Sequence, residues 1–409
     1  MKGALVAALL LRPAMSSPQP SIHGYKSSKP WLPQTPVTSM PTAEQLMENR
    51  PLPKDFDWRN VNGQNFATAD LNQHQPYYCG SCWIHGTTSA LNDRIKIMRR
   101  ARFPDVILSR QSLMNCIPDP TGAGPPPGCH GGDPIMIHKF MHEHKVPDET
   151  CLSYSALNQE CTPLDVCRNC FRVMPPDPNN PFKPGPCWGE PTFIGYGVSD
   201  YGQMSGEAAM MKEIYARGPI ACSFVTTPEF VQNYANNAGV LRDGIFRDPT
   251  KYNESDIDHV MEVTGWGETS EGAKFWVVRN SWGTYWGLAG WFLLERGTNS
   301  LLSEEHCDWG VPDFAEIDYD LLHQVQGDYY KGVPGGAPNA GFDFVGNVSS
   351  GQQLAVAWGP TLRKADQPHI RFFDLAATGI MGAIVGGALV SGVPRLWRMS
   401  HVNQPRLLG

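Results

Sequence analysis

The stretch Gln73-His-Gln-Pro-Tyr-Tyr-Cys-Gly-Ser-Cys-Trp83 brings a glutamine, a histidine and two cysteines together within eleven residues. Far downstream the chain contains Asp258-His259 and then Asn280-Ser-Trp-Gly283. One cysteine with a distant histidine and asparagine is the arrangement expected of a thiol hydrolase. We expect Cys82 to be the nucleophile, because it begins a helical pattern and a helix N-terminus favours the thiolate.

The other residues of this pattern have complementary roles. His259 begins an apolar run and lies 21 positions before Asn280 (280 − 259). Its imidazole can exchange the proton while the Asn280 amide orients the ring and Trp282 shields that hydrogen bond. Gln73 and the backbone N–H of Cys82 are expected to stabilise an oxyanion. Singly, His259 and Gln73 would be interpreted as a structural and a surface residue; the combination favours catalysis.

Charge and cysteine content limit the class of protein. The net charge is −7 and no long basic run is present, which argues against a nucleic-acid partner. All eleven cysteines lie between Cys79 and Cys307. Ten can pair and leave one thiol, as in an oxidised secretory-pathway enzyme. The two-residue gaps at Cys79/Cys82 and Cys167/Cys170 allow a zinc site as the alternative, but the motif around Cys82 favours catalysis without metal or cofactor.

The N-terminal residues predict entry into the secretory pathway. Residues 1–16 contain a short apolar run after Lys2 and are expected to be a signal peptide. Residues 17–52 are rich in proline and serine and predict an extended segment rather than a domain. Asn253 and Asn347 each begin an Asn-X-Ser glycosylation triplet. The expected location is a lysosome-like or vacuole-like acidic compartment, or the extracellular space.

The C-terminal residues predict a membrane anchor. Residues 315–373 contain no cysteine and are interpreted as a stem. Residues 374–393 are expected to form a transmembrane helix, since nineteen of them, 375–393, are uncharged. The basic tail 394–409 would then be cytoplasmic and the enzyme luminal. The alternative is a buried helix or an apolar tail, because five glycines lower the helix propensity of this run.

Between these ends the periodicity predicts an α+β protein. Helices are expected over 82–100, from Ser109 to 116, from Asp133 onward, and over 205–216. Strands are expected over 220–225, 259–265, 275–279 and 290–294. Residues 171–186 are expected to form a proline-rich loop whose ends are held by a disulfide.

Several motifs resemble those of the papain-like cysteine peptidases, and within them the cathepsin X (cathepsin Z) subfamily. The family motifs are Cys79-Gly-Ser-Cys-Trp83, Gly128-Cys-His-Gly-Gly132, His259 before Gly265-Trp-Gly267, and Asn280-Ser-Trp-Gly283. The subfamily likeness rests on Asp57–Val61, Asn72–His74, Pro147–Cys151, Ile214–Ala216 and Glu304–Cys307. The resemblance implies a two-lobed domain over 53–314, with a helical lobe and a β-barrel lobe. It also implies acyl-enzyme hydrolysis of peptides bound along Gly131, Gly132 and Trp282.

The resemblance further implies a carboxypeptidase made as a zymogen. In the subfamily a loop histidine binds the substrate's terminal carboxylate, and His74 matches it. Gln73 lies nine positions before Cys82 (82 − 73), which is longer than in ordinary papain-like enzymes, so the loop insertion of the subfamily is present. Gln75 replaces an aliphatic residue of that loop, so an endopeptidase or a looser exopeptidase is the alternative. Residues 17–52 correspond to a short propeptide that covers the cleft and contains no cysteine.

Two other classes of protein are weighed. A thiol oxidoreductase would use the Cys79-Gly-Ser-Cys82 spacing but leaves Asn280–Gly283 unexplained. An inactive papain-like binding protein would lack the nucleophile or the base, and this chain has both. The resemblance also implies a disulfide pairing, which the spacing alone leaves open: Cys79–Cys129, Cys116–Cys161, Cys151–Cys167, Cys170–Cys187 and Cys222–Cys307.

Overall fold

The computed structural model describes residues 24–29, 32, 35–47, 50–172, 178–180, 184–234, 243–313 and 324–326. The expected signal peptide, Asn347, the transmembrane segment 374–393, the basic tail and nearly all of the stem lie outside the described residues. Among the described helices, none combines the length and the apolar composition that crossing a bilayer requires.

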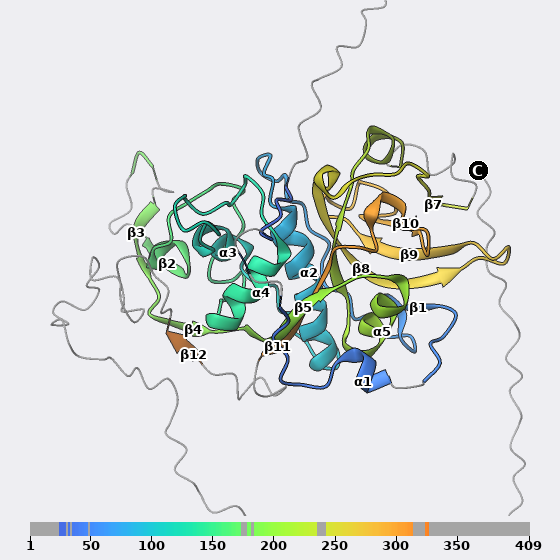
Figure 1. Ribbon diagram of the computed structural model, residues 1–409. Coiled ribbons are helices and arrows are strands. Elements are labelled where there is room, and N and C mark those ends of the chain that lie inside the picture. The colour runs from blue at the N-terminus through green and yellow to red at the C-terminus, as the bar shows by residue number, and fades with distance from the viewer. Residues whose placement is uncertain are drawn as a thin grey trace, which may run out of the picture. The chain divides into compact units, whose positions relative to one another are not determined.

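A helical part and a β-rich part lie on either side of one long helix, α2 (Cys82–Met98) (Figure 1). Residues 82–95 of this helix are all buried, so it is covered on every side rather than on one face. The remaining helices and single turns are α1 (Ala43–Met47), α3 (Arg110–Cys116), α4 (Pro134–Glu143), α5 (Glu207–Arg217), η1 (Trp58–Asn60), η2 (Pro163–Asp165), η3 (Glu229–Tyr234), η4 (Glu254–Asp256) and η5 (Ser300–Leu302).

Two of the expected helix starts are capped by the predicted residues. The Ser109 side chain accepts a hydrogen bond from the backbone N–H of Ser112 at the start of α3. The Asp133 side chain accepts from the backbone N–H of Ile135 at the start of α4, where Pro134 occupies the first turn. Such caps satisfy backbone donors that the helix itself leaves unpaired.

The β-rich part is one sheet with the strand order β5-β11-β6-β8-β9-β10-β7, and β1 pairs with β8. All its pairings are antiparallel except that between β10 and β7. The strands are β1 (Phe56–Asp57), β5 (Gly197–Met204), β6 (Ile220–Phe224), β7 (Ile245–Phe246), β8 (His259–Glu268), β9 (Lys274–Arg279), β10 (Trp291–Glu295) and β11 (Cys307–Asp313).

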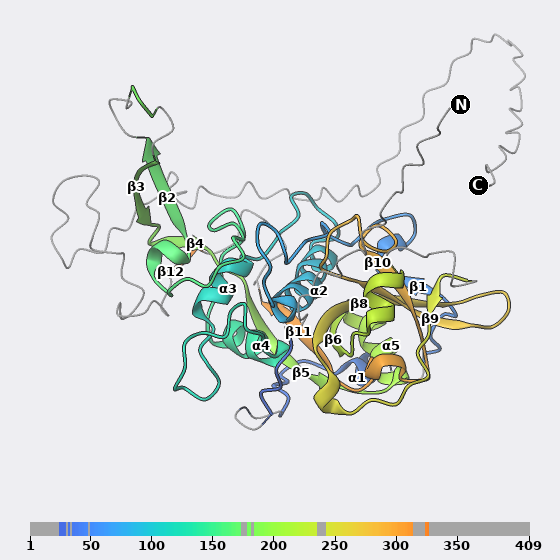
Figure 2. The same cartoon turned by 90° about the horizontal axis from the view of Figure 1, so that it is seen from above.

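The region expected as a proline-rich loop instead contributes to a hairpin. Strands β2 (Arg168–Arg172) and β3 (Pro184–Gly189) pair antiparallel, with Cys170 opposite Cys187. Figure 2 shows this hairpin extending away from the helices beside it. The loop prediction was therefore wrong at both ends, because pairing across the Cys170–Cys187 disulfide overrides the low strand propensity of proline and glycine. A further small pair joins β4 (Thr192–Ile194) and β12 (Gln324–Gln326).

The five disulfides in the structure are the five pairs that the resemblance implied: Cys79–Cys129, Cys116–Cys161, Cys151–Cys167, Cys170–Cys187 and Cys222–Cys307. Four of them lie within the helical part or its hairpin, and the fifth joins β6 to β11. Cys82 is the free cysteine.

Buried ion pairs connect α2 to the β-rich part. Arg94 Nη2 of α2 donates to Glu213 Oε1 of α5 at 2.9 Å, and both side chains are buried. Asp93 of α2 accepts from Arg279 Nη2 of β9 at 2.7 Å. These bonds fix the register of α2 against the sheet, and thereby the position of its first residue.

Candidate active site

Cys82 is the first residue of α2 and its side chain is fully buried. Burial raises the pKa of the Cys82 thiol well above its usual range, and the backbone donors of Val260, Trp83 and Cys82 itself partly offset this by favouring the thiolate. The sulfur is therefore close to the backbone of Val260, the residue that directly follows His259. Gly86 allows this approach, since a Cβ there would lie 3.0 Å from Val260 Cγ1.

His259, Asn280 and Trp282 meet as the sequence predicted. His259 Nε2 lies 2.9 Å from Asn280 Oδ1, and the indole of Trp282 stacks on the imidazole with ring centroids 4.9 Å apart. Because an amide oxygen can only accept, Nε2 carries the proton and Nδ1 is unprotonated in the neutral ring. Burial lowers the pKa of His259 to about 4, and the hydrogen bond to Asn280 partly offsets this. Nδ1 therefore has a lone pair available for a proton.

Gln73 is buried and held from both ends. Its Oε1 accepts from Ser281 Oγ at 2.6 Å, and its Nε2 donates to the carbonyl of Cys79 at 2.9 Å. Its backbone N–H also bonds to the carbonyl of Ser281 at 2.8 Å. An amide nitrogen has two hydrogens, so one donor of Gln73 is left for another acceptor. The Gln73 side chain thus connects Ser281 to Cys79, in the segment that leads into α2.

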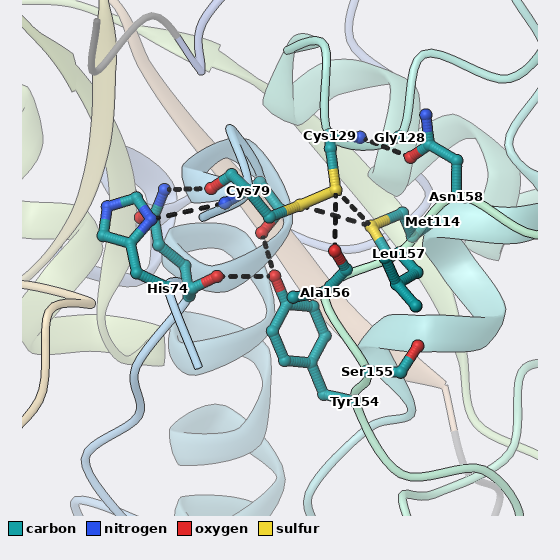
Figure 3. Close-up of a disulfide and its surroundings, with 12 residues drawn as sticks. His74, Cys79, Met114, Gly128, Cys129, Tyr154, Ser155, Ala156, Leu157 and Asn158 are labelled. Carbon is teal, nitrogen blue, oxygen red and sulfur yellow. Dashed lines mark hydrogen bonds between the residues drawn. A yellow bond between two sulfur atoms is a disulfide. The ribbon is translucent and has the colours of Figure 1, made fainter. Parts of the chain in front are cut away.

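His74 lies on the short loop between Gln73 and Cys82 and stacks on Tyr78, with ring centroids 4.6 Å apart. The backbone N–H of Cys79 approaches His74 Nδ1 at 3.4 Å (Figure 3). Burial lowers the pKa of His74 to about 4. The free His74 imidazole is therefore neutral above about pH 4, and since Nδ1 accepts from Cys79, its proton is on Nε2.

The described N-terminal residues 24–47 (the N-terminal segment) pass directly over the thiol. The backbone N–H of Gly24 bonds to the carbonyl of Asp258 at 2.9 Å, and the carbonyl of Gly24 accepts from Gly132 at 3.2 Å. Lys26 N–H donates to the carbonyl of Gly132 at 3.0 Å, so the segment pairs with residue 132 as a strand would. The segment therefore occupies the backbone hydrogen-bonding groups of Gly132 and the carbonyl of Asp258.

The backbone conformation and the close packing here require glycine at positions 131 and 132. Gly131 has a φ of +90°, which an L side chain rarely adopts. A Cβ on Gly132 would lie 2.7 Å from the Trp83 ring. The backbone of the two residues can thus approach a bound chain on one side and the indole on the other.

Further contacts hold the N-terminal segment outside the thiol region. Ser28 donates to Asp133 Oδ2 through both its backbone N–H, at 2.8 Å, and its hydroxyl, at 3.0 Å. Lys29 Nζ forms an ion pair with Glu254 at 2.5 Å. Val37 and Tyr201 exchange two backbone hydrogen bonds of 2.9 Å each. The segment is therefore bound along both the helical and the β-rich parts.

Sequence reasoning missed several residues around the thiol. Tyr154 bonds to Ser81 and to the carbonyl of Gln73, and Asp133, which also accepts from Ser28, was expected only as a helix cap. The hydrophobic periodicity has no signal for such contacts, because residues 73, 81 and 154 come from separate loops. A cavity of about 940 Å³ is lined in part by Thr226 and by Asp258, the residue before His259.

Asn253, one of the two predicted glycosylation acceptors, is exposed. It is the N-cap of η4, where its side chain accepts from the backbone and its own backbone N–H donates to Asp256 Oδ2 at 2.7 Å. Its position on the surface is compatible with a modified side chain.

Comparisons with known proteins agree with this geometry. The family described as "Papain family cysteine protease" matches residues 52–310. Cathepsin Z of Onchocerca volvulus is 40% identical over 269 residues, covering 64% of this chain and 78% of the relative. Pro-cathepsin H of Bos taurus is 27% identical over 253 residues, covering 61% of this chain and 62% of the relative.

A solved structure from a study of the mite allergens Blo t 1 and Der p 1 has the same fold. It superposes with a TM-score of 0.50 at 26% identity, covering 71% of this chain and 80% of the other. The expected two-part fold is thus confirmed, and the match covers the region that contains Cys82, His259 and Asn280. The chain belongs to the papain family of cysteine proteases.

Proposed function

We propose that this cysteine peptidase is a carboxypeptidase that removes single residues from the C-termini of peptides. The observation that carries the proposal is the position of His74, a half-buried residue on the loop that joins Gln73 to Cys82. A carboxylate one residue beyond the scissile bond would accept from His74 Nε2–H. A neutral imidazole can make this bond, and the bound carboxylate then favours the protonated ring.

In this proposal Cys82 attacks the peptide carbonyl and His259 takes the thiol proton at Nδ1. The sulfur–carbon bond forms as the carbonyl becomes an oxyanion, which the Cys82 N–H and the free Gln73 donor stabilise. His259 then protonates the leaving amine, and water hydrolyses the thioester to regenerate the thiol. Asn280 and Trp282 keep the imidazole oriented, as their contacts with His259 support.

The N-terminal segment is proposed to be the propeptide of a zymogen. Its backbone occupies Gly132 and covers Cys82, and no cysteine in it can bond to the thiol. Removal of the segment would hydrate the site, which lowers the thiol pKa and raises that of His259. Both changes favour the thiolate–imidazolium pair.

The cellular setting is proposed from the sequence and the disulfides. Five disulfides suit the secretory pathway and an acidic or extracellular compartment. Residues 374–393 are proposed to anchor the enzyme in the membrane, with glycans at Asn253 and Asn347. Retention of the full chain in the membrane fraction after alkaline carbonate washing would test the anchor.

The deciding experiment compares one peptide with a free and with an amidated C-terminus at acidic pH, with products followed by mass. The proposal expects stepwise loss of single residues from the free acid only. His74→Ala should remove this preference, whereas His74→Gln, which keeps a neutral donor, should retain part of it. Tyr77→Ala is the control in the same loop, since the Tyr77 side chain is 59% exposed. Internal cleavage of both peptides would support an endopeptidase instead.

A further inference from the structure

The hydroxyl of Tyr154 lies between the two segments that carry Gln73 and Cys82. It donates to the backbone carbonyl of Gln73 at 2.8 Å and lies 2.7 Å from Ser81 Oγ. Figure 3 shows the ring directed toward the segment that holds His74 and Cys79. The hydroxyl thus contacts both the residue before His74 and the residue before the thiol.

The chemistry of these atoms fixes the direction of every hydrogen bond. A carbonyl only accepts, so the single proton of Tyr154 goes to Gln73, and Tyr154 Oη must accept from Ser81 Oγ. Ser81 Oγ in turn lies 3.2 Å from His85 Nδ1, which is also 3.0 Å from the Ser81 carbonyl. Nδ1 is then the protonated nitrogen of His85. The donors run from His85 through Ser81 and Tyr154 to the carbonyl of Gln73.

This chain of hydrogen bonds diverts Ser81 from its usual role. Ser81 is the N-cap of α2, a position at which a serine side chain ordinarily accepts from a backbone N–H of the first turn. Here its side chain makes no such bond. The first-turn N–H groups of Cys82 and Trp83 act on the Cys82 thiol, whose pKa they lower against the larger effect of burial. A side-chain oxygen that capped the helix would accept from a first-turn N–H such as that of Trp83, and would compete with the thiolate for it.

The ring of Tyr154 is held independently of its hydroxyl. The His85 ring packs edge-on against it with centroids 4.7 Å apart, and the Arg110 guanidinium lies 5.3 Å from its centroid. Tyr154→Phe therefore removes the hydrogen bonds and keeps the packing.

We propose that Tyr154 is a positioning residue for catalysis: its hydroxyl fixes the Gln73 backbone and holds Ser81 away from the end of α2. The Gln73 amide and the first-turn N–H groups of α2 are then aimed at one oxyanion and one thiolate. The inference rests on the roles proposed above for Cys82 and Gln73.

The test compares Tyr154→Phe with unsubstituted enzyme, both prepared as the full chain and then activated. The kcat on a free-acid peptide should fall by about tenfold to a hundredfold, with KM within about twofold, because misplaced donors weaken only the transition state. The rate of Cys82 alkylation by iodoacetamide should reach its half-maximum at a higher pH, since Ser81 becomes free to cap α2.

The matched control is Tyr234→Phe. Tyr234 is also buried, and its hydroxyl donates to the carbonyl of Gly244 and accepts from the N–H of Leu293, both at 3.0 Å. This variant should lose thermal stability to a similar extent while kcat and the alkylation midpoint stay unchanged.

Two results would overturn the inference. One is a Tyr154→Phe kcat within about twofold of the unsubstituted enzyme, or a loss that Tyr234→Phe reproduces. The other is an alkylation midpoint that does not move. If the unsubstituted enzyme failed to cleave peptides, the proposed function would be wrong, and the alkylation midpoint would still decide whether Tyr154 controls the end of α2.

Discussion

A Cβ added to Gly24 would lie 2.4 Å from the sulfur of Cys82 and 3.0 Å from the carbonyl oxygen of Gly80. No side chain fits there while the backbone of residue 24 stays bonded to Asp258 and Gly132. The contact between the segment and the thiol thus depends on a glycine, and this has a direct consequence for latency.

Gly24→Ala should make the unprocessed chain partly active. Crowding in a packed site costs roughly 1–3 kcal/mol, so binding of the segment should weaken by about tenfold or more. The measurement is the rate at which a thiol-reactive peptide probe labels the intact chain at pH 6.5.

Lys26→Ala is the control for this change, because the Lys26 side chain is exposed and its backbone bond to Gly132 is kept. Equal labelling of Gly24→Ala and unsubstituted chain would contradict the proposed tight contact over the thiol.

Ser28→Ala should weaken binding of the N-terminal segment to the rest of the enzyme, and most strongly at neutral pH. Burial raises the pKa of Asp133, whereas the two hydrogen bonds from Ser28 lower it by stabilising the carboxylate. The lost hydroxyl bond to a charged acceptor is worth about 1.5–3 kcal/mol while Asp133 is ionised. As the pH falls and Asp133 takes up a proton, the difference between variant and unsubstituted segment should shrink.

This prediction can be measured with a synthetic peptide of residues 17–52 as an inhibitor of the activated enzyme, with Ki followed from pH 7 to pH 4. Thr42→Ala in the same peptide is the control, since the Thr42 hydroxyl bonds to Gln45, which belongs to the same segment. A Ser28→Ala effect that stays constant with pH would show that ionised Asp133 is not the acceptor that matters.

His138→Leu should reduce acid destabilisation of the fold. The ring of His138 is fully buried without a hydrogen-bond partner among the described residues, and burial lowers its pKa to about 3. An unfolded chain has the ordinary higher pKa and binds more protons, so stability falls as the pH drops from about 6.5 toward 3. Between pH 7 and pH 4.5 this single group costs about 2 kcal/mol.

Urea unfolding of the Cys82→Ala chain, which prevents self-digestion, would measure this at the two pH values. The decrease in the free energy of unfolding from pH 7 to pH 4.5 should be smaller in His138→Leu by about 2 kcal/mol. His130→Leu is the control, because His130 is exposed. The same pH dependence in His138→Leu and the parent would show that His138 takes up its proton without unfolding.

Glu213→Gln should destabilise the fold strongly. Glu213 accepts from Arg94 and from Arg217 Nε, each at 2.9 Å, and the side chains of Arg94 and Glu213 are at most 1% exposed. Removing the carboxylate leaves a buried guanidinium without its counter-charge, which typically costs about 3–5 kcal/mol.

Glu143→Gln provides the matched comparison, because Glu143 is paired with Lys139 on the surface of α4 and is 48% exposed. The free energy of unfolding of Glu143→Gln should stay within about 0.5 kcal/mol of that of the unsubstituted chain. Both values can be obtained from urea midpoints at pH 6, and similar losses in the two variants would mean that burial does not set the strength of the Arg94 pair.

Local sequence was sufficient for the elements that carry the candidate residues. Cys82 begins α2, His259 begins β8, and Ser109 and Asp133 cap their helices as predicted. In each case the signal lies within a few neighbouring residues, as a cap, a turn or an apolar run. Such signals report on short-range sterics and hydrogen bonding, which hold in any fold that accepts the element.

Other strands could not be predicted from local patterns. β5 and β11 contain glycine, aspartate and proline, and none of their residues was expected to be in a strand. They form because β11 pairs with β5 on one side and β6 on the other. Strand propensity is weak against such long-range pairing, so composition alone gives the wrong answer here.

The sequence by itself determined the family, the candidate residues of the site and most helix starts, since these depend on residue identity and near neighbours. Only the tertiary structure decided that α2 is buried on all sides, that Gly24 covers the Cys82 sulfur, and that Tyr154 joins Gln73 to Ser81. These relationships link residues up to 81 positions apart along the chain. They arise from close packing of separate loops, which no local periodicity encodes.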